Sequence, residues 1–276
     1  MLKRVLLQFA LACLLAASHV PCFAQARQAL VIGNAAYQYA DPLRNSVNDA
    51  ELLAASLKQI GFKVTLLRDA SLVQMSRAAA EFGRGLGRND IAFVYFAGHG
   101  VQHGGENYLI PIDARVEQPE ELRAHAFPIS QLFAALPADG RSSNIVVLDA
   151  CRNNPFAGRS PAYSRSLGAA KPDERGLARV EVPAGLSQLE NVPGNTLIAY
   201  ATSPGKVALD GDGRNSPYAE ALASVMLDEG LEVTAVFQEA TLLVKRATRY
   251  QQEPWMNWSL NDKVFFKKRK SNNVIF

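Results

Sequence analysis

Short apolar runs alternate with amphipathic segments along most of this chain. The runs predict strands at residues 29–32, 63–67, 91–97, 108–112, 145–148 and 196–201. Apolar positions at helical spacing predict helices at residues 47–57, 71–86, 128–136, 218–227 and 233–250. This alternation is typical of an α/β fold, and we expect a mostly parallel central sheet of about six strands with helices on both faces.

The first 26 residues have a different pattern. Lys3 and Arg4 precede an almost wholly apolar run over residues 5–17, and small residues occupy both outer positions of Ala24-Gln-Ala26. These features predict a secretory signal peptide over residues 1–26, cleaved after Ala26 or, as the alternative, after Ala24. The apolar run is shorter than the roughly 18–20 residues that span a bilayer. We therefore expect no stable membrane anchor after cleavage, and an exported bacterial protein that is periplasmic or secreted.

Composition and charge exclude several classes of protein. Of the 276 residues, 48% are hydrophobic and 20% are charged, which is ordinary for a folded globular chain. A disordered chain, a collagen and a disulfide-dense miniprotein are excluded. The formal charge is +3, and Lys3 and Arg4 leave with the signal peptide. The mature chain is then nearly neutral, so we expect no nucleic acid as a partner.

Cysteine usage singles out one residue. Cys13 and Cys22 lie in the predicted signal peptide, so the mature chain carries only Cys151. Cys151 and His99 each come just after one of the apolar runs. Because the carboxyl ends of parallel strands share one edge of a sheet, we expect both side chains there, where an imidazole can activate a thiol. Taken alone, each residue fits an inert core cysteine or a loop histidine better, but the pair at matching strand ends favours chemistry.

Six segments carry motifs that are specific when they are taken together. They are FVYFAGHG at residues 93–100, VVLDACRN at 146–153, ALVIGN at 29–34, LRNSVNDA at 43–50, YATSPG at 200–205 and GRNSPY at 213–218. They resemble the caspase-like peptidase family, and within it the bacterial caspase-like and metacaspase group of the clan CD cysteine peptidases. The similarity covers roughly residues 28–258 and implies a caspase-like fold.

The resemblance also implies a division of the chain. The implied peptidase domain covers residues 27–258. It has a large-subunit-like part at about 28–152, a linker loop at 153–195 and a small-subunit-like part at 196–258. Beyond the resemblance, we expect a C-terminal strand and a basic tail at 259–276. The linker segment lacks regular periodicity and is rich in proline, glycine and arginine, as a long loop would be.

The activity that the resemblance implies is that of a thiol endopeptidase acting on peptide or protein substrates. Cys151 is implied as the nucleophile, and His99 as the group that holds its proton and protonates the leaving amine. The amides of Gly100 and Cys151 are implied as the donors to the oxyanion. No third catalytic residue is evident, and the family usually works with a Cys–His dyad.

Two other functions are alternatives to catalysis. A non-catalytic caspase-fold module that binds peptides or partner proteins is the alternative, and the presence of both His99 and Cys151 favours the enzyme. A flavodoxin-like small-molecule binder is disfavoured, because Gly33–Ala36 is a poor cofactor-binding loop.

Two acidic residues bear on specificity. Asp149 stands where caspases have a glutamine, two residues before the cysteine, and metacaspases carry an aspartate there. Another metacaspase aspartate lies in the motif matched by Asp49. The resemblance therefore implies that Asp49 and Asp149 line an acidic pocket for an arginine or lysine before the cut bond. The alternatives are a solvated helix residue for Asp49 and a strand-end cap for Asp149.

An enzyme that cuts after basic residues has candidate self-cleavage sites in its own linker. These are Arg159, Arg165, Lys171, Arg175 and Arg179. The alternative is a flexible surface loop whose arginines serve solubility.

No cofactor or metal site is predicted. His103 follows His99 by four residues, but the glycines around them argue against a helix that presents both to a metal. Some metacaspases require calcium, yet Asp210 and Asp212 do not have the spacing of a known calcium loop, so calcium dependence is unsupported. The oligomeric state is not predicted from the sequence.

Overall fold

The computed structural model describes residues 25–137, 139–151, 186, 189, 192–203 and 208–269, and of Cys151 only the main chain. Residues 1–24 of the predicted signal peptide, most of the predicted linker and residues 270–276 lie outside the described residues. The five candidate self-cleavage residues lie outside them too.

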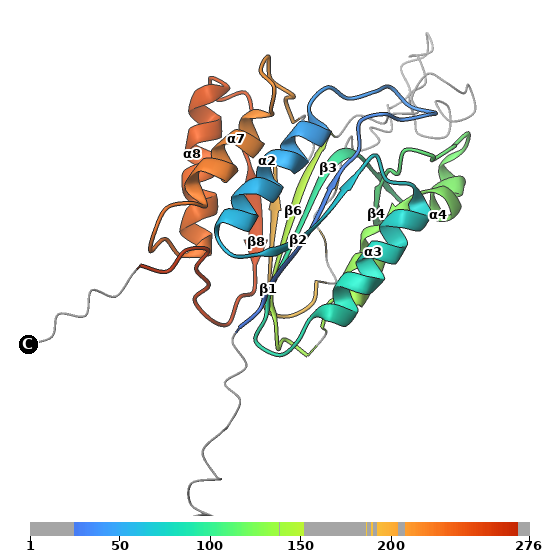
Figure 1. Cartoon of the computed structure of the whole chain (residues 1–276). Coiled ribbons are helices and arrows are strands. Elements are labelled where there is room, and N and C mark those ends of the chain that lie inside the picture. Colours follow the sequence, from blue (N-terminus) through green and yellow to red (C-terminus); the bar gives the residue numbers. More distant parts are fainter. Residues whose placement is uncertain are drawn as a thin grey trace, which may run out of the picture.

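One twisted sheet forms the centre of the molecule (Figure 1). Six of its strands are β1 (Arg27–Gly33), β2 (Lys63–Arg68), β3 (Ile91–His103), β6 (Ser143–Cys151), β7 (Thr196–Tyr200) and β8 (Trp255–Trp258). They follow the order β2-β1-β3-β6-β7-β8, and all neighbours pair in parallel except β8, which is antiparallel to β7. The predicted α/β class with a mostly parallel central sheet is therefore confirmed.

Helices cover both faces of the sheet (Figure 1). On one face lie α2 (Ser46–Gln59), α7 (Pro217–Val225) and α8 (Val233–Ala247), and on the other α3 (Leu72–Gly85) and α5 (Ile129–Ala135). Alternate residues of β3 supply both cores, since Phe93 and Tyr95 pack towards the first face and Val94 and Phe96 towards the second. This double burial is why the strands appear in the sequence as unbroken apolar runs.

Local signals set the ends of two helices as the sequence predicts. The Ser71 hydroxyl accepts a hydrogen bond from the main-chain N–H of Gln74 at 3.3 Å, and the Gln74 side chain accepts one from the N–H of Ser71 at 2.8 Å. This reciprocal capping box opens α3. After α2, Gly61 adopts a φ of +88°, which favours glycine over other residues.

The third strand is longer than predicted. We expected it to end at residue 97, but β3 continues through His99 to His103 and turns at Gly104–Gly105 into the antiparallel strand β4 (Glu106–Leu109). Main-chain pairing with β4 sustains this extension, in which Val101 is the one buried apolar side chain. A two-residue strand, β5 (Phe127–Pro128), then pairs with β4, and η1 (Pro119–Glu121) and α4 (Leu122–His125) lie between β4 and β5 in the chain.

The last strand of the sheet lies earlier than predicted. We expected a strand within residues 259–276, whereas β8 ends at Trp258. Within the described part of that segment there is one isolated bridge, between Phe265 and Glu232.

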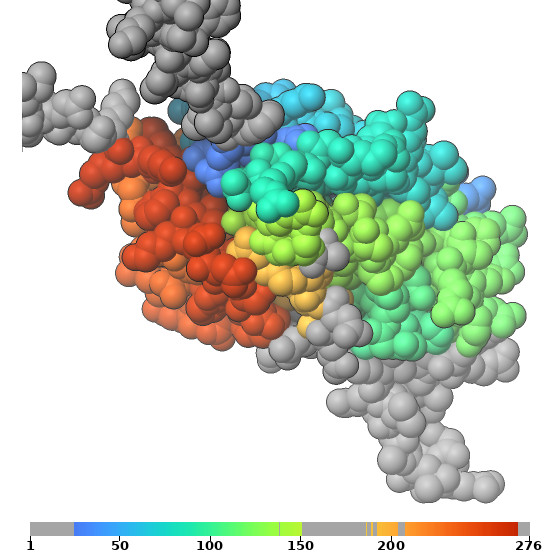
Figure 2. All heavy atoms as spheres, turned by 90° about the horizontal axis from the view of Figure 1, so that it is seen from below, coloured from blue at the N-terminus to red at the C-terminus, as the bar shows by residue number. Residues whose placement is uncertain are grey.

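Seen from below, α8 and the C-terminal segment, in orange and red, lie at the opposite end of the molecule from the α4 region, in green (Figure 2). Among the described helices, none is long and apolar enough to cross a membrane.

Candidate active site

The carboxyl ends of the parallel strands meet at the upper edge of the sheet in Figure 1. The register pairs His99 of β3 with Cys151 of β6. Their α-carbons are therefore neighbours on adjacent strands, which lie about 4.8 Å apart. The main chain thus brings the two predicted catalytic residues to the same point of the edge.

The imidazole of His99 is buried and held at one of its nitrogens. Its Nε2 atom lies 2.8 Å from the carbonyl oxygen of Asp41. A carbonyl oxygen can only accept, so Nε2 carries the proton and Nδ1 has a free lone pair. Nδ1 is buried and has no hydrogen-bond partner among the described residues. Burial lowers the pKa of His99, and the hydrogen bond to Asp41 offsets this only in part, so the ring is a neutral base near pH 7.

The glycines around His99 are required by the protein itself. A Cβ atom on Gly98 would lie 2.6 Å from the hydroxyl of Tyr37, and one on Gly100 would lie 3.0 Å from the side chains of Ala150 and Leu186. The carbonyl of His99 accepts a hydrogen bond from Ile110 at 3.0 Å, on the β4 side of β3. Successive main-chain groups of a strand point to opposite edges, so the N–H of Gly100 faces the β6 side, where Cys151 lies.

The two acidic residues singled out in the sequence lie together behind this edge. The Asp149 Oδ2 atom accepts hydrogen bonds from the hydroxyls of Tyr95 at 2.8 Å and Ser216 at 3.0 Å. The Asp49 Oδ1 atom accepts from the amide of Asn215 and from the main-chain N–H of Ser216, both at 2.9 Å. Ser216 therefore joins both carboxyl groups, and the described residues donate to only one oxygen of each. Asp49 is buried, so it is not the solvated helix residue of the alternative interpretation. The printed donors to Asp149 are two side-chain hydroxyls rather than the main-chain N–H groups that a strand-end cap would bind.

Both carboxyl groups resist ionisation. Burial is the main cause that raises the pKa of Asp149 to about 7, and the negative charge of Asp49 adds to it. Burial likewise raises the pKa of Asp49 to about 6, although its hydrogen bonds from Asn215 and Ser216 act against the rise. Near neutral pH the pair therefore holds less than two full negative charges.

A third acid, Asp210, acts on this site, although its sequence context suggests only an unsupported role in calcium binding. The charge of Asp210 raises the pKa of Asp49, Asp149 and His99 alike. Its carbonyl oxygen accepts a hydrogen bond from the side chain of Asn45 at 2.6 Å. Nothing in the local sequence reveals this placement, because it depends on the 208–216 segment folding back over α2.

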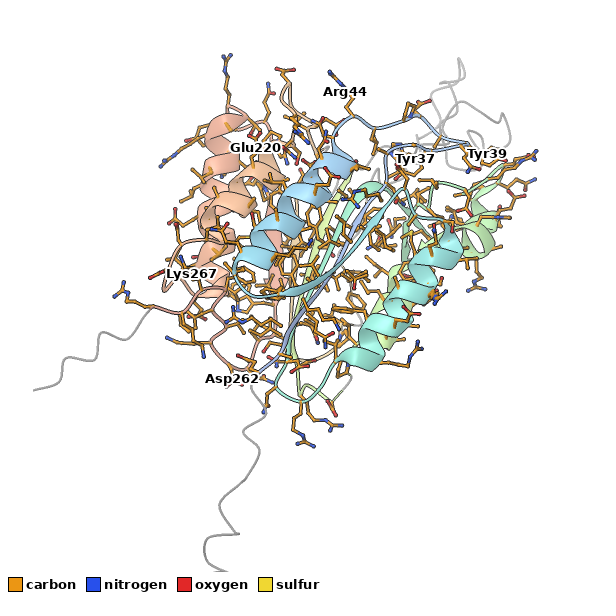
Figure 3. The ribbon with its side chains drawn as sticks, viewed as in Figure 1. Tyr37, Tyr39, Arg44, Glu220, Asp262 and Lys267 are labelled. Carbon is orange, nitrogen blue, oxygen red and sulfur yellow. The ribbon has the colours of Figure 1, made fainter. Side chains whose placement is uncertain are left out.

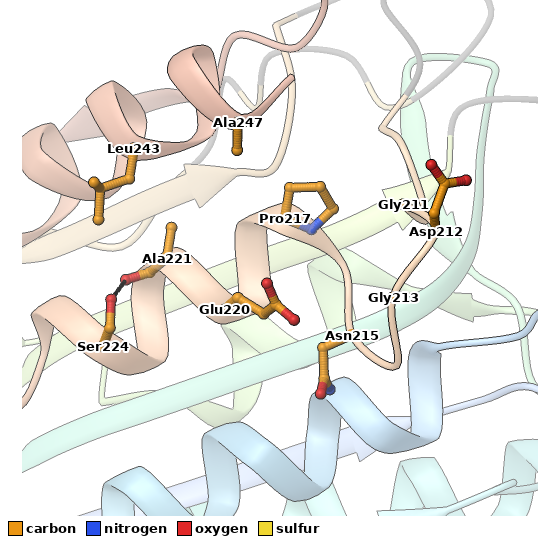
Figure 4. A pocket seen from close by; sticks show the side chains of 10 residues that line it. All are labelled: Gly211, Asp212, Gly213, Asn215, Pro217, Glu220, Ala221, Ser224, Leu243 and Ala247. Atoms are coloured by element: carbon orange, nitrogen blue, oxygen red, sulfur yellow. Dashed lines mark hydrogen bonds between the residues drawn. The ribbon is translucent and has the colours of Figure 1, made fainter. Parts of the chain in front are cut away.

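Two asparagines at the start of α2 hold the 208–216 segment. Asn45 also approaches the carbonyl of Gly213 at 3.4 Å, and Asn48 donates to the carbonyl of Arg214 at 3.1 Å. In the close-up, the segment descends past Gly213, and Asn215 points towards α2 (Figure 4). The segment, α7 and α8 together line a cavity of about 390 Å³. Asn215 belongs to this lining and donates to Asp49.

The Asp41 carbonyl is another feature that sequence reasoning missed. A main-chain oxygen leaves no residue-type signal, so only the path of the chain after β1 could identify it.

His103 lies four positions beyond His99 on the same strand, which separates the two by about 13 Å. Among the described residues no group of three His, Cys, Asp or Glu side chains could hold a metal ion.

Comparisons with known proteins bear on the fold and the family. A family model for the caspase domain matches residues 26–265. The human mucosa-associated lymphoid tissue lymphoma translocation protein 1 and its mouse homologue are each 29% identical over 130 residues, which is 47% of this chain. The chain spans only 15% of the length of these two relatives.

A solved structure shares the same architecture. Caspase-1 from Spodoptera frugiperda matches with a TM-score of 0.62 and 16% sequence identity, over 90% of this chain and 92% of the caspase. This likeness establishes a caspase-like fold. Because the family model spans almost all of the described residues, the chain belongs to the caspase-domain family of peptidases.

Proposed function

We propose that this protein is an exported cysteine endopeptidase that cuts peptide bonds after arginine or lysine. The observation that carries the proposal is the register of His99 and Cys151 on adjacent strands, together with a buried His99 Nδ1 atom that the described residues leave without a partner. Membership of a peptidase family supports the same reaction class.

The reaction follows from these groups. The Cys151 thiol gives its proton to Nδ1 of His99, and the thiolate attacks the scissile carbonyl to form a tetrahedral oxyanion. The main-chain N–H groups of Gly100 and Cys151 stabilise that oxyanion. Collapse breaks the C–N bond, and the leaving amine takes the proton from Nδ1. Water, deprotonated by His99, then hydrolyses the thioester and restores the thiol.

The acid cluster supports a basic residue before the cut bond. Asp49 and Asp149 each keep one oxygen that no described residue donates to, and Asp210 adds negative charge nearby. A guanidinium or ammonium group brings the countercharge that allows both acids to ionise. A substrate aspartate would instead add a like charge in a buried place, which disfavours it.

A positional peptide library tests the proposal. The wild-type protein, cleaved from its signal, should release products with arginine or lysine at the new carboxyl terminus. Cys151→Ala should abolish release, and Asp149→Asn should reduce the preference for basic residues. Parallel runs with calcium and with a chelator measure any calcium effect. A wild-type protein that cuts no member of the library would favour the non-catalytic binding module instead.

The hydrogen bonds of Ala26 support the alternative cleavage site of the signal peptide. Ala26 donates to Asp90 at 3.0 Å, and its carbonyl accepts from the N–H of Ile91 at 2.9 Å. Cleavage after Ala26 would remove both bonds, and cleavage after Ala24 would keep them. We therefore propose a mature chain that begins at Gln25, and amino-terminal sequencing of the exported protein checks this. A first residue of Arg27 would contradict it.

Self-cleavage in the linker is part of the same proposal. After incubation, new carboxyl termini should appear at one or more of Arg159, Arg165, Lys171, Arg175 and Arg179. The Cys151→Ala variant should stay intact under the same conditions. Identical fragments from both proteins would show that a contaminating peptidase made the cuts.

A further inference from the structure

Residues 34–41, the segment that follows β1, lie against His99 on the side of β3 away from β6, the strand of Cys151. Tyr37 belongs to this segment, and it lies at the upper end of the sheet with Tyr39 further out (Figure 3). We propose that Tyr37 is a positioning residue for His99, and that Asp69 acts through Tyr37 by anchoring the segment. This inference rests on the proposed function, because it assigns both residues a part in the proton relay at His99.

Tyr37 contacts both the main chain and the ring of His99. Its hydroxyl accepts a hydrogen bond from the N–H of His99 at 2.8 Å. The two rings lie with their centroids 4.5 Å apart and their planes inclined by 43°. The hydroxyl reaches this position only because residue 98 is glycine, since a Cβ atom there would lie 2.6 Å away. Tyr37 is itself buried, so the contact is fixed within the fold.

These contacts restrict the imidazole in a way that matters for the relay. The Asp41 carbonyl, four residues after Tyr37, binds Nε2, and Tyr37 packs against the ring. A ring turned about its χ2 bond would lose the Asp41 bond and exchange the two nitrogens. Held as it is, the ring keeps its proton at Nε2 and its lone pair at Nδ1, which is the state that a base towards Cys151 requires.

Asp69 anchors this segment through hydrogen bonds to its main chain. Its Oδ1 atom accepts hydrogen bonds from the main-chain N–H groups of Ala35 and Ala36, both at 2.8 Å. Its own N–H donates to the carbonyl of Gly33 at 2.9 Å, and its φ of +48° is unusual for a residue with a side chain. A strained residue with three fixed main-chain partners indicates a position that the fold requires. Tyr37 comes directly after the two anchored residues.

The chain provides matched controls for both residues. Tyr39 lies in the same segment but is 42% exposed, so Tyr39→Phe controls for the loss of a tyrosine hydroxyl. Asp90 also accepts two main-chain N–H groups, from Ala26 at 3.0 Å and Gly87 at 2.7 Å, but near the amino end of β3, remote from His99. Asp90→Ala therefore controls for the stability that Asp69→Ala costs.

The test compares kinetics on a peptide with arginine before the cut bond. Tyr37→Phe should lower kcat by about tenfold, a fraction of the roughly 10²–10⁴-fold contribution of acid–base catalysis, and leave KM within about twofold. Tyr37→Leu should lower kcat further, because it also removes the ring contact. Asp69→Ala should lower kcat while Asp90→Ala and Tyr39→Phe do not. A kcat for Tyr37→Phe equal to that of Tyr39→Phe would overturn the proposal.

A second readout does not depend on peptidase activity. Long-range ¹H–¹⁵N NMR spectra report which ring nitrogen carries the proton, and a His103→Asn spectrum helps to assign His99. The wild-type protein should show the Nε2–H tautomer, and Tyr37→Phe and Tyr37→Leu should show a mixture of tautomers. If the wild type cleaves nothing, the proposed function fails, and the spectra still decide the positioning role. Equal tautomer populations in wild type and both variants would overturn it.

Discussion

The chemistry of single side chains is set here by burial. Asp149 and Asp49 lie together with few donors, and each lacks a countercharge among the described residues that bind it. Burial keeps the pKa of each acid raised, and the countercharge of the proposed basic residue would favour the ionised form of both. His99 is the opposite case, because burial lowers its pKa and keeps it a base.

The raised pKa values of the two acids predict a pH dependence of substrate binding. Asp149, with a pKa of about 7, and Asp49, with one of about 6, are protonated below those values and charged above them. KM for a peptide with arginine before the cut bond should therefore fall as pH rises from about 5.5 to 8. Steady-state kinetics across this range measures it. Asp49→Asn should move the fall to lower pH, because it removes the like charge beside Asp149, and an unmoved profile would contradict the coupling.

The same acids have the opposite effect on folding. A carboxyl group whose folded pKa is raised stabilises the fold below its unfolded pKa of about 4, and this contribution is lost as pH rises through the folded value. Asp149→Asn should therefore raise Tm by about 2–4 °C more at pH 8 than at pH 5. Thermal unfolding at the two pH values checks this, and an equal change at both would show that Asp149 is charged throughout.

At the scale of elements, helix α7 links the fold to the acid pair. Ser216 caps the helix by accepting from the N–H of Ala219 at 3.1 Å, and the same hydroxyl donates to Asp149. Pro217 at the first helical position fixes the entry of the chain. The orientation of Asp149 therefore depends on where α7 begins.

A substitution at this cap should affect both stability and specificity. Ser216→Ala removes the cap and one donor, so we expect a loss of about 1 kcal/mol in the free energy of unfolding and a higher KM for basic substrates. Ser216→Thr should retain both bonds. Ser224→Ala is the control, since that hydroxyl donates to the Ala221 carbonyl at 2.8 Å in the same helix but away from the acids. An unchanged KM in Ser216→Ala would separate the cap from the site.

The elements also show what the sequence can and cannot predict. Strands β1 and β6 are evident as apolar runs because helices bury them on both faces. The extension of β3 past Gly98 is not evident, because it carries one apolar side chain, Val101, and relies on pairing with β4. Strand β8 is not evident either, because its four residues are too few to show a period, although Trp255 and Met256 pack against the two cores. At the site, the placement of His99 and Cys151 at the carboxyl edge of the parallel strands follows from topology. The contacts of Asp41 and Asp210 depend on loop paths, which have no period to detect.

At the scale of the whole molecule, the first strand holds the C-terminal segment. The guanidinium of Arg27 donates to the carbonyls of Ile60 and Phe265, both at 3.1 Å, and to that of Phe266. It also lies 5.8 Å from the ring centre of Phe62. Planar donors on several sides suit these partners, and a lysine ammonium cannot reach them all.

These Arg27 contacts lie far from the candidate active site. Their loss should therefore affect the stability of the protein alone. Arg27→Lys should lower the free energy of unfolding by about 2 kcal/mol, as expected for lost hydrogen bonds to a charged group. Denaturant titration measures this, with kcat/KM for a basic peptide as the control for the site. A fall in kcat/KM for the folded variant would show that the C-terminal segment acts on catalysis.

The central claim is that Cys151 and His99 act as a nucleophile and its base beside a site for a basic residue. It is tested most directly by the rates at which peptide chloromethylketones alkylate Cys151 in the mature protein. Intact-mass spectrometry and peptide mapping would follow two probes that differ only in arginine or aspartate before the reactive carbon. The account predicts modification of Cys151, faster with the arginyl probe, and slowed by His99→Asn. Equal, slow labelling by both probes, unaffected by His99→Asn, would contradict it.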